Sequence, residues 1–325
     1  MSFRPWRYLP VSLAHSLAGV GVELSATFFG QDEPATWNSF SAKGLVFPNR
    51  LGLAGGVDKE GDHLLAWQKL GAGFVEVGTV TPVPQEPNPG KIMDRDWERG
   101  NLWNKMGFPS AGMKDVAANL ATKRNDLKIP VFVNLGKNRA TPAEAAKEDY
   151  LRVQKEFLHL ADGFVVNVSS PNTQGLRGLQ SAAYLKPLVE PVVQAARGKP
   201  VWVKLSPDQT PQEFQESLTA SAEAGVSGFV LTNTTLHRPE GCPFPPEGGL
   251  SGRDLKPLSE ARLQDAVRIL GSSRRDFVIV SVGGIESMDD VKRRLDLGAD
   301  LLEVYSSLVF EGPRFFQRLE KSWRS

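Results

Sequence analysis

The chain has 325 residues, 41% hydrophobic and 23% charged, and its 38 Lys and Arg residues against 37 Asp and Glu residues give a net charge of +1. This is the balance of an ordinary globular protein, so net charge gives no support to nucleic-acid binding. The length fits two domains, or one (β/α)₈ barrel of about 250 residues with an appendage. The single cysteine, Cys242, excludes an intramolecular disulfide and a Cys/His metal cluster, so no metal site is expected.

The first 30 residues differ in character from the rest of the chain. Fifteen residues without a formal charge lie between Arg7 and Glu23, but Pro10, Ser12 and His15 are among them. A membrane span needs about 20 predominantly apolar residues, so no transmembrane helix is expected. The apolar stretch is also weak for a secretory signal peptide and lacks a small-residue cleavage site.

The same segment predicts a short helix that carries one apolar stripe. The stripe recurs at helical spacing and has aromatic residues near its ends: Leu13, Leu17, Val20, Leu24 and Phe28, flanked by Trp6, Tyr8 and Phe29. Periodicity alone favours a helix that packs this stripe on the main domain. The alternative is that the stripe enters a bilayer interface or lines an apolar tunnel.

After residue 43, short apolar runs rich in β-branched residues alternate with helix-compatible stretches. There are eight such runs: 51–54, 73–77, 131–134, 164–167, 201–204, 228–232, 278–282 and 301–304. Apolar runs separated by helical segments indicate parallel strands buried on both faces. The sequence therefore predicts an α/β protein, a closed (β/α)₈ TIM barrel. An open doubly wound sheet is the alternative, but its G-x-G-x-x-G turn is absent.

Two connections, 78–130 and 233–277, are too long for one helix and its turns, so each is expected to carry an inserted loop. Long loops in compact domains are often lids or binding loops. In a barrel the loops that follow the strands form the active face.

Polar residues follow the predicted strands, at the positions that face the ligand in such barrels. They are Lys59, Thr79, Asn134, Asn167, Ser170, Lys204, Thr232, Asn233, Gly283, Gly284, Tyr305 and Ser306. Asn and Thr offer uncharged donors and acceptors, which suit a flat heterocycle, and glycines after the seventh strand suit a phosphate. No paired carboxylates and no His-based nucleophile emerge at these strand ends, so redox chemistry is favoured over hydrolysis.

The chain resembles the class 2, quinone-linked dihydroorotate dehydrogenases, which are flavin enzymes of pyrimidine synthesis. The resemblance runs in order over about residues 43–315. It is carried by GLAGGVDK at 52–59, GFVEVGTVTP at 73–82, NKMGF at 104–108, NLGKN at 134–138, NVSSPNTQGLRGLQ at 167–180, TNTT at 232–235, GGLSGR at 248–253, VGGI at 282–285 and YSSLVFEGP at 305–313.

This resemblance implies FMN on the C-terminal face of the barrel and oxidation of dihydroorotate to orotate, with a quinone as final electron acceptor. The implied flavin-ring contacts are Ala54, Gly55, Thr79, Asn134, Asn167, Lys204 and Thr232, and the implied phosphate contacts are Gly252, Gly283, Gly284, Tyr305 and Ser306. The implied substrate contacts are Lys59, Asn104, Gly107, Phe108, Asn167, Asn172, Asn233 and Thr234.

The resemblance also assigns the base. In the family motif the serine directly before Pro171-Asn172 removes the C5 proton while hydride passes from C6 to the flavin, which selects Ser170 over Ser169. Lys59, Thr173 and Phe108 complete the implied catalytic set, with Thr173 or a water passing the proton onward. The alternative for Ser170 is a turn or cap before Pro171. Class 1 relatives carry a cysteine base, whereas Cys242 lies far along the chain.

The resemblance divides the chain into a membrane and quinone-tunnel extension, residues 1–42, and an FMN-binding barrel domain, residues 43–325. It implies a monomer on the cytoplasmic face of a bacterial inner membrane, with the mitochondrial inner membrane as the alternative. His15 is expected at the quinone or in solvent. There are two competing functions. One is FMN-dependent chemistry on another dihydropyrimidine or an enone, and the other is flavin binding without catalysis.

The chain also departs from the family pattern at several positions. Gly55 stands where the family usually has alanine, and Ser281 precedes the Val282-Gly283 pair. The segment 91–99 is divergent, so no quinone-side role is carried over to Arg95.

Overall fold

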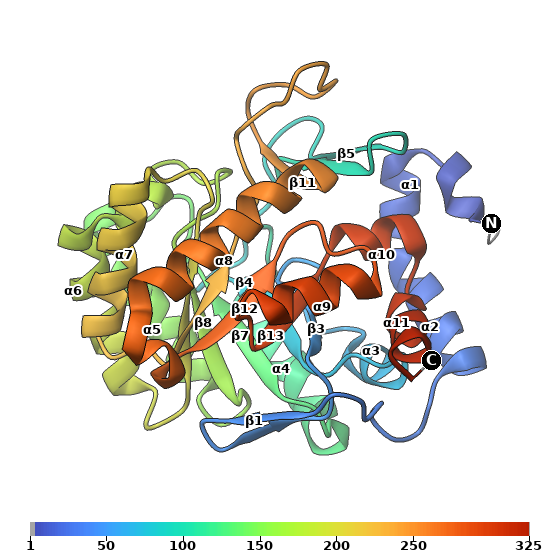
Figure 1. Ribbon diagram of the computed structural model, residues 1–325, viewed down its shortest axis with the longest axis horizontal. Helices are drawn as coiled ribbons and strands as arrows, with labels where there is room; N and C mark the ends of the chain where they lie inside the picture. Colours follow the sequence, from blue (N-terminus) through green and yellow to red (C-terminus); the bar gives the residue numbers. More distant parts are fainter. Residues whose placement is uncertain (1–3, 325) are drawn as a thin grey trace.

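The computed structural model describes residues 4–324, and eight parallel strands close into a barrel at its centre (Figure 1). Around the barrel the strands follow one another as β3 (Leu51–Leu53), β4 (Val75–Val80), β7 (Val131–Leu135), β8 (Gly163–Asn167), β9 (Val201–Leu205), β10 (Gly228–Leu231), β12 (Val278–Val282) and β13 (Leu301–Val304). Each overlaps one of the predicted runs. The predicted TIM barrel is therefore confirmed.

One helix follows each barrel strand and covers the outside of the barrel. These helices are α3 (Leu64–Lys69), α4 (Met113–Lys123), α5 (Ala146–Phe157), α6 (Ala182–Ala195), α7 (Pro211–Glu223), α8 (Lys256–Leu270), α9 (Met288–Asp296) and α11 (Phe315–Arg324), with the short α10 (Ser306–Glu311) inserted before α11. Single 3₁₀ turns are η2 (Arg124–Asp126), η3 (Ala143–Ala145), η4 (Leu176–Gln180), η5 (Arg253–Leu255) and η6 (Gly271–Asp276). Capping boxes fix the N-termini of two helices. Thr210 and Glu213 cap α7, and Ser287 and Asp290 cap α9.

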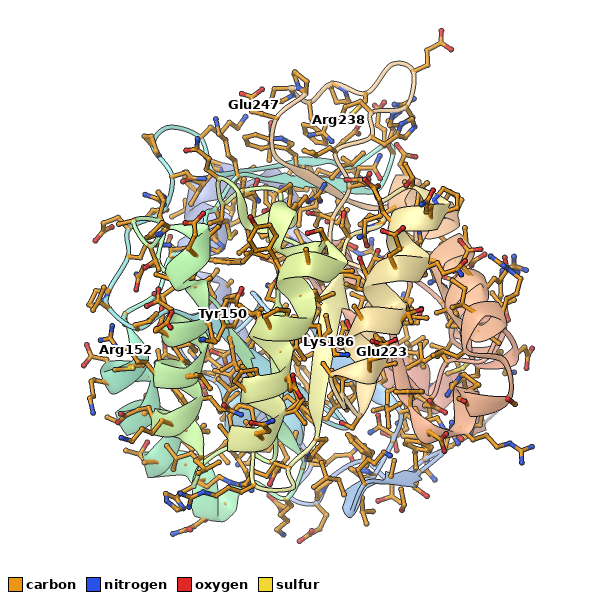
Figure 2. All side chains as sticks on the ribbon, turned by 90° about the vertical axis from the view of Figure 1, so that its left-hand side faces the viewer. Tyr150, Arg152, Lys186, Glu223, Arg238 and Glu247 are labelled. Atoms are coloured by element: carbon orange, nitrogen blue, oxygen red, sulfur yellow. The ribbon has the colours of Figure 1, made fainter. Side chains whose placement is uncertain are left out.

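Figure 2 looks onto α5, α6 and α7, whose side chains hold the helices to each other and to the barrel. Lys186 on α6 pairs with Glu223 on α7 at 2.9 Å. Tyr150 on α5 is buried and donates its hydroxyl hydrogen bond to the backbone oxygen of Asn167, at the end of β8, at 2.7 Å. Burial raises the pKa of Tyr150. The helix layer thus positions the end of a strand that carries site residues.

The N-terminal end of the barrel is closed by a hairpin of β1 (Phe40–Ala42) and β2 (Leu45–Phe47). Phe47 packs with its ring centroid 5.5 Å from that of Phe74, and Phe132 stacks on Trp202 at 3.7 Å inside the barrel. These rings fill the lower interior with apolar volume. The hairpin spans the proposed boundary at residues 42 and 43, and the division into two domains stays a prediction.

The two long connections meet above the C-terminal end of the barrel. The first contributes β5 (Met93–Asp96) and β6 (Asn101–Asn104), and the second contributes β11 (Gly249–Gly252). They form one antiparallel sheet in the order β11-β6-β5, at the top of Figure 1. The prediction of inserted structure at the active face is confirmed, and the pairing of the two insertions is a feature that the sequence pattern did not reveal.

The N-terminal segment forms η1 (Pro5–Tyr8), α1 (Val11–Ser16) and α2 (Ala18–Phe29), beside α3 and α10 (Figure 1). The prediction that this segment packs its apolar stripe on the main domain is wrong. Leu24 and Phe28 are 54% and 74% exposed, and Val22 and Ala26 are buried instead. The stripe is therefore largely exposed, and its Leu17 also lines a cavity against the barrel, as the alternative required. Within residues 4–324, no helix is long and apolar enough to cross a membrane.

Candidate active site

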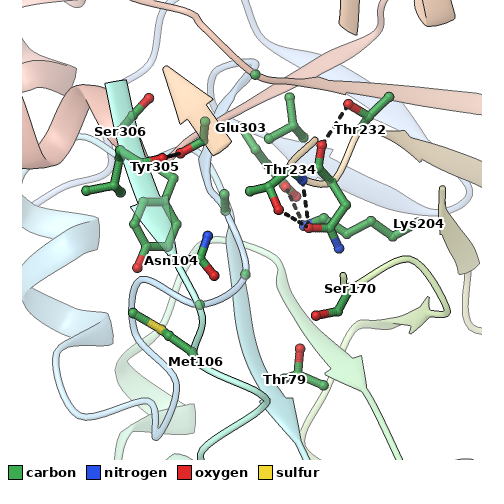
Figure 3. Close-up of a pocket in the computed structure, with 18 of the residues that line it drawn as sticks. Thr79, Asn104, Met106, Ser170, Lys204, Thr232, Thr234, Glu303, Tyr305 and Ser306 are labelled. Atoms are coloured by element: carbon green, nitrogen blue, oxygen red, sulfur yellow. Dashed lines mark hydrogen bonds and ion pairs between the residues drawn. The ribbon is translucent and has the colours of Figure 1, made fainter. Parts of the chain in front are cut away.

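A polar cavity opens at the C-terminal end of the barrel, beneath the sheet of β5, β6 and β11 (Figure 3). Of the predicted site residues, the following line it: Ala54, Gly55, Lys59, Thr79, Asn104, Gly107, Phe108, Asn167, Ser170, Asn172, Lys204, Thr232, Asn233, Thr234, Gly283, Gly284, Tyr305 and Ser306. Among the lining residues that sequence reasoning missed are Met106, Ser251, Glu303 and Ser307. Asn134, Gly252 and Thr173 do not line this cavity. His15 lines a second cavity, described below.

Asn167 organises the floor of this cavity through its amide. Its Nδ2 donates to Thr79 Oγ1 at 3.1 Å and to Asn134 Oδ1 at 3.2 Å, and Asn233 Nδ2 approaches its Oδ1 at 3.4 Å. Asn134 is thus one layer below the cavity, where it orients Asn167. The side chains come from four different strands or strand ends, so closure of the barrel is what brings them together.

Two buried carboxyl groups flank Lys204. Neither is predicted from the sequence, because the site candidates there are residues at the strand ends. The Lys204 Nζ lies 2.9 Å from Glu76 Oε1 and 3.7 Å from Glu303 Oε2. Asn134 Nδ2 donates to Glu76 Oε1 at 2.5 Å. Burial lowers the pKa of Lys204, but the charges of Glu76 and Glu303 outweigh it and the pKa lies above its ordinary value. The two carboxyl groups therefore favour the charged form of Lys204 at the base of the cavity.

Gly55, one of the departures from the family pattern, lies against this cluster. A Cβ atom on Gly55 would stand 2.1 Å from Glu76 Oε1, so an alanine at this position would displace the carboxylate that binds Lys204. Glycine at position 55 leaves room for that side chain.

Glu303 is expected to make stability depend on pH. Burial raises the pKa of Glu303 well above its usual range, helped by the charge of Glu76 and opposed by Lys204. A folded pKa above the unfolded one means that the stabilising contribution is complete at low pH and is lost as pH rises toward the folded pKa. Glu303→Gln cannot ionise, so its melting temperature should fall less than that of the wild type as pH rises from the ordinary carboxyl pKa toward the raised pKa of Glu303.

Differential scanning fluorimetry across this pH range checks the prediction. Glu320→Gln, which alters a carboxyl group paired with Arg324 outside the cavity, is the control and should follow the wild type. A Glu303→Gln curve parallel to the wild-type curve would contradict the assignment.

The structure separates the two adjacent serines. Ser169 Oγ donates to Asn167 Oδ1 at 3.2 Å and accepts from Asn233 Nδ2 at 3.0 Å, so both functions of its hydroxyl are used. Ser170 lines the cavity, and its Oγ accepts the Asn172 N–H at 3.2 Å. That contact is the turn expected as the alternative, yet it leaves the Ser170 hydroxyl proton available. The buried Thr173 Oγ1 has no hydrogen-bond partner within residues 4–324.

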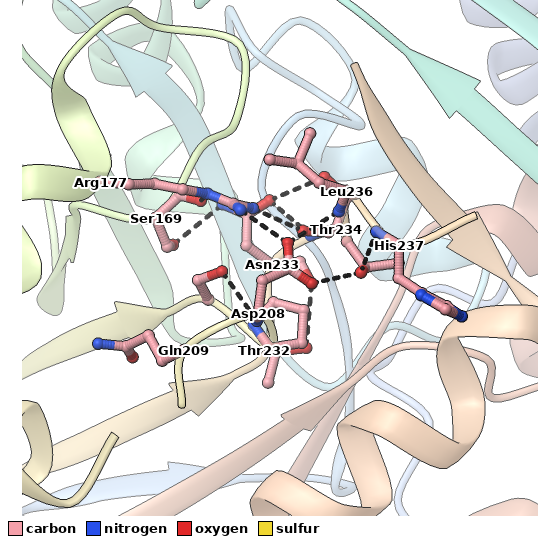
Figure 4. A network of polar contacts seen from close by, with 12 residues as sticks. Ser169, Arg177, Asp208, Gln209, Thr232, Asn233, Thr234, Leu236 and His237 are labelled. Atoms are coloured by element: carbon pink, nitrogen blue, oxygen red, sulfur yellow. Dashed lines mark hydrogen bonds and ion pairs between the residues drawn. The ribbon is translucent and has the colours of Figure 1, made fainter. Parts of the chain in front are cut away.

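Arg177, which sequence reasoning did not single out, joins the loop after β8 to the loop after β10 (Figure 4). Its Nε donates to the backbone oxygen of Ser169 at 3.0 Å, and its Nη2 donates to that of Thr234 at 3.0 Å. Its Nη1 pairs with Asp208 at 2.7 Å. The guanidinium therefore fixes the spacing of two loops that carry site residues.

The loop after β6 forms the opposite wall. Asn172 Nδ2 donates to Asn104 Oδ1 at 2.7 Å. Gly107 and Phe108 both adopt positive φ, +74° and +58°, and Gln85 Nε2 donates to their carbonyl oxygens at 2.8 Å and 3.0 Å. A Phe in the left-handed backbone conformation is energetically unfavourable unless neighbouring groups hold the backbone there. The hydrogen bonds from Gln85 do so. The strained loop thus presents a fixed backbone to the cavity.

A second cavity of about 620 Å³ lies between the N-terminal helices and the barrel. Apolar side chains of α1, α2 and α10 form much of its wall, and His15 also lines it. Four residues line both cavities: Lys59, Met106, Pro109 and Tyr305. Burial lowers the pKa of His15, as does the charge of Lys59. The two cavities are therefore neighbours that share a wall.

Arg95, in the divergent segment, connects elements of the wall of the second cavity. Its Nη2 donates to the backbone oxygens of Trp6 at 2.8 Å and Leu9 at 2.7 Å, and its guanidinium lies over the Trp97 ring. Trp6 in turn donates to the backbone oxygen of Val309 at 3.0 Å. These contacts join η1 to β5 and α10, so the N-terminal segment has a defined place.

Glycines shape the end of the first cavity near β12. Gly252, Gly283 and Gly284 have φ of +101°, +121° and +71°, a region that side chains disfavour. A Cβ on Gly284 would stand 2.5 Å from the Lys256 Cβ and 2.9 Å from the Gly252 oxygen. A Cβ on Gly252 would stand 2.2 Å from the Gly100 oxygen, so glycine at 252 makes room for the start of β6, behind the lining.

Known proteins resemble this chain over most of its length. A family model for dihydroorotate dehydrogenase matches residues 39–325. The dihydroorotate dehydrogenase (quinone) of Thermus thermophilus is 44% identical over 282 residues, covering 86% of this chain and 80% of that protein. That of Deinococcus radiodurans is 45% identical over 279 residues, covering 82% and 74%.

The fold comparison agrees. The crystal structure of DHODH in complex with ferulenol from Eimeria tenella superposes with a TM-score of 0.85 at 32% identity, covering 96% of this chain and 90% of that one. The ligand-free structure from the same organism gives a TM-score of 0.84. By sequence and by fold, the chain belongs to the dihydroorotate dehydrogenase family.

Proposed function

We propose that this chain oxidises dihydroorotate to orotate with FMN and passes the electrons to a membrane quinone. The observation that carries the proposal is the shared wall of Lys59, Met106, Pro109 and Tyr305 between a polar and a largely apolar cavity. A polar substrate and an apolar acceptor can then reach one cofactor from different sides. The names of the relatives, which specify a quinone, support the same assignment.

The polar cavity fits FMN in the chemistry of its donors. The uncharged side chains of Thr79, Asn167 and Thr232 suit the carbonyl and nitrogen edge of a flavin, and the cation of Lys204 suits the electron-rich pyrimidine end. The cradle left by Gly283 and Gly284 suits the phosphate, because backbone N–H groups bind anions there. When bound, FMN supplies the hydride acceptor.

Dihydroorotate would be held by the residues around Asn172. Within residues 4–324, the Lys59 ammonium forms no hydrogen bond or ion pair, which leaves it free for the carboxylate of the substrate. Asn104, Asn172, Asn233 and Thr234 offer both donors and acceptors to the amide edges. Asn88 Nδ2 donates to the Asn172 backbone oxygen at 3.0 Å and keeps this wall in place.

Ser170 would take the C5 proton. Its Oγ faces the cavity and accepts one hydrogen bond from the Asn172 N–H, so a lone pair and the hydroxyl proton both remain for transfer. A serine hydroxyl is a weak base alone, so its proton must move on as it accepts another. The unpaired, buried Thr173 Oγ1 is the nearest candidate in sequence for that transfer.

The proposal is tested by anaerobic stopped-flow absorbance of the purified protein at the flavin band. Dihydroorotate should bleach the flavin, and a short-chain quinone should then restore the colour, while NAD and fumarate should not. A bound flavin that stays oxidised in dihydroorotate would overturn the substrate assignment and favour another dihydropyrimidine or an enone. Recovery with NAD or fumarate alone would overturn the quinone assignment.

The outward stripe of α1 and α2 is proposed to rest on the cytoplasmic face of a bacterial inner membrane, so that the quinone enters the second cavity from the bilayer. The double variant Leu17→Glu and Leu24→Glu should lower binding to phospholipid vesicles at least about tenfold, since burying a charge in the interface opposes insertion. Val46→Glu is the control, because Val46 is 66% exposed on the hairpin at the N-terminal end of the barrel.

Vesicle co-sedimentation measures this difference, and turnover with a water-soluble acceptor checks that the variants stay intact. Equal loss of binding in Val46→Glu and in the double variant would show that the stripe is not the docking surface.

A further inference from the structure

Arg294, near the end of α9, is fully buried behind the glycine turn of the first cavity. A fully buried guanidinium is rare, because removing its charge from water is costly unless partners surround it. The burial lowers the pKa of Arg294 to about 10, which still leaves it charged at neutral pH. Its carboxylate partner is Glu260, whose Oε1 lies 3.5 Å from the Arg294 Nε, and no step of the proposed mechanism uses this ion pair.

The partners of Arg294 come from both sides of the glycine turn. Its Nη2 donates to the backbone oxygen of Gly283 at 2.7 Å and to Ser259 Oγ at 2.7 Å, and Nη1 donates to Ser281 Oγ at 2.8 Å. Nη2 also reaches the Lys256 backbone oxygen at 3.3 Å. Ser281 is one of the positions at which the chain departs from the family pattern. One side chain thus joins β12, the turn after it and the start of α8.

Ser259 Oγ also lies 3.0 Å from the Gly283 carbonyl oxygen, and its one proton is shared between that oxygen and the Lys256 backbone oxygen at 3.1 Å. The Arg294 hydrogen bond and this shared contact hold the Gly283-Gly284 peptide in one orientation. The peptide is trans, so its N–H points away from the oxygen and therefore away from Arg294. Within residues 4–324, the Gly284 N–H finds no acceptor. Donors on a carbonyl also polarise the N–H of the same peptide, which strengthens it as a donor.

We propose that Arg294 is a positioning residue that sets the specificity of the cavity for a phosphorylated flavin over an unphosphorylated one. The inference rests on the proposed FMN function. Within residues 4–324, Lys59 and Lys204 are the only lysines or arginines among the residues lining the cavity, and neither lies at the glycine turn. The phosphate would therefore depend on backbone N–H groups, and Arg294 fixes and polarises the one at Gly284.

The test compares FMN with riboflavin, which lacks the phosphate. Holoprotein carrying either flavin is diluted, and the rise in flavin fluorescence gives the release rate. Arg294→Met should release FMN at least tenfold faster than the wild type, while riboflavin release changes less than threefold. A purely structural role for Arg294 would accelerate both releases alike, and that result would overturn the proposal.

Arg274→Met is the matched control. Arg274 pairs with Asp300 at 2.7 Å and donates to the Phe277 backbone oxygen at 2.7 Å, so it stabilises the start of β12 at the opposite end of the barrel. It should leave the ratio of FMN release to riboflavin release unchanged. A change in that ratio equal to the one in Arg294→Met would overturn the proposal.

Ser259→Ala keeps the proposal falsifiable if Arg294→Met does not fold. It removes one hydrogen bond to the Gly283 oxygen and one partner of Arg294, and it should raise FMN release about threefold without affecting riboflavin. An unchanged ratio in a folded Ser259→Ala protein would overturn the proposal. A wild-type protein that binds neither flavin would instead overturn the proposed FMN function, so the two failures are distinguishable.

Discussion

Ser170→Ala is expected to slow bleaching of the flavin by dihydroorotate by about 10²–10⁴-fold, the usual contribution of a positioned general base. Orotate binding should be nearly unchanged, because Lys59, Asn104 and Asn172 remain in place. Stopped-flow bleaching at a series of pH values measures both effects. In the wild type the rate should rise with pH, as catalysis by a weakly acidic hydroxyl requires, and the variant should lose that rise.

Ser169→Ala is the matched control for this substitution. The two hydroxyls belong to neighbouring residues, but that of Ser169 is held between Asn167 and Asn233 and does not line the cavity. Its loss should disturb the amide floor and flavin binding more than the pH profile. A Ser169→Ala variant that loses the pH-dependent rise, while Ser170→Ala keeps it, would reverse the assignment of the base.

The barrel could be predicted from the sequence because its strands are buried on both faces. Val131–Leu135 and Val278–Val282 are buried at every position, and such strands read as continuous apolar runs. The sheet of β5, β6 and β11 could not be predicted in the same way. Its strands pair residues such as Leu102 and Ser251, about 150 positions apart, and four-residue strands carry little periodicity of their own.

The N-terminal helix shows the limit of periodicity. Leu13, Leu17 and Leu24 form a stripe whether it packs inward or faces out, and the favoured prediction of an inward stripe was wrong because Val22 and Ala26 supply the packing face. The single i, i+4 pair of Val22 and Ala26 was inconspicuous beside the longer leucine stripe, although the stripe's aromatic ends were the signal for the alternative.

The site was predicted where polar residues stand at strand ends, and the carboxyl groups of Glu76 and Glu303 were missed. Glu76 and Glu303 sit within strands, and their contact with Lys204 depends on the closure of a barrel that brings β4, β9 and β13 to a common interior. A charged residue inside an otherwise apolar run was the available signal, since such a residue is buried only with a partner.

Lys59→Ala is expected to weaken orotate binding by about 2–5 kcal/mol, or at least about 30-fold, since it removes the cation that faces the carboxylate. Titration of the flavin absorbance with orotate measures the loss. Lys137→Ala is the matched control. Lys137 is a buried lysine whose Nζ donates to the Thr141 backbone oxygen at 2.8 Å, outside both cavities. Unchanged orotate affinity in Lys59→Ala would favour a different substrate.

The pH dependence of this affinity identifies the titrating group. Burial lowers the pKa of Lys59, and the charges of Glu60 and Asp58 oppose that shift only in part. Orotate needs the charged ammonium, so its affinity should fall as pH rises through the lowered pKa of Lys59, sooner than with an exposed lysine. Lys59→Arg stays charged throughout and should remove this fall. A fall that persists in Lys59→Arg would assign the titration to another group.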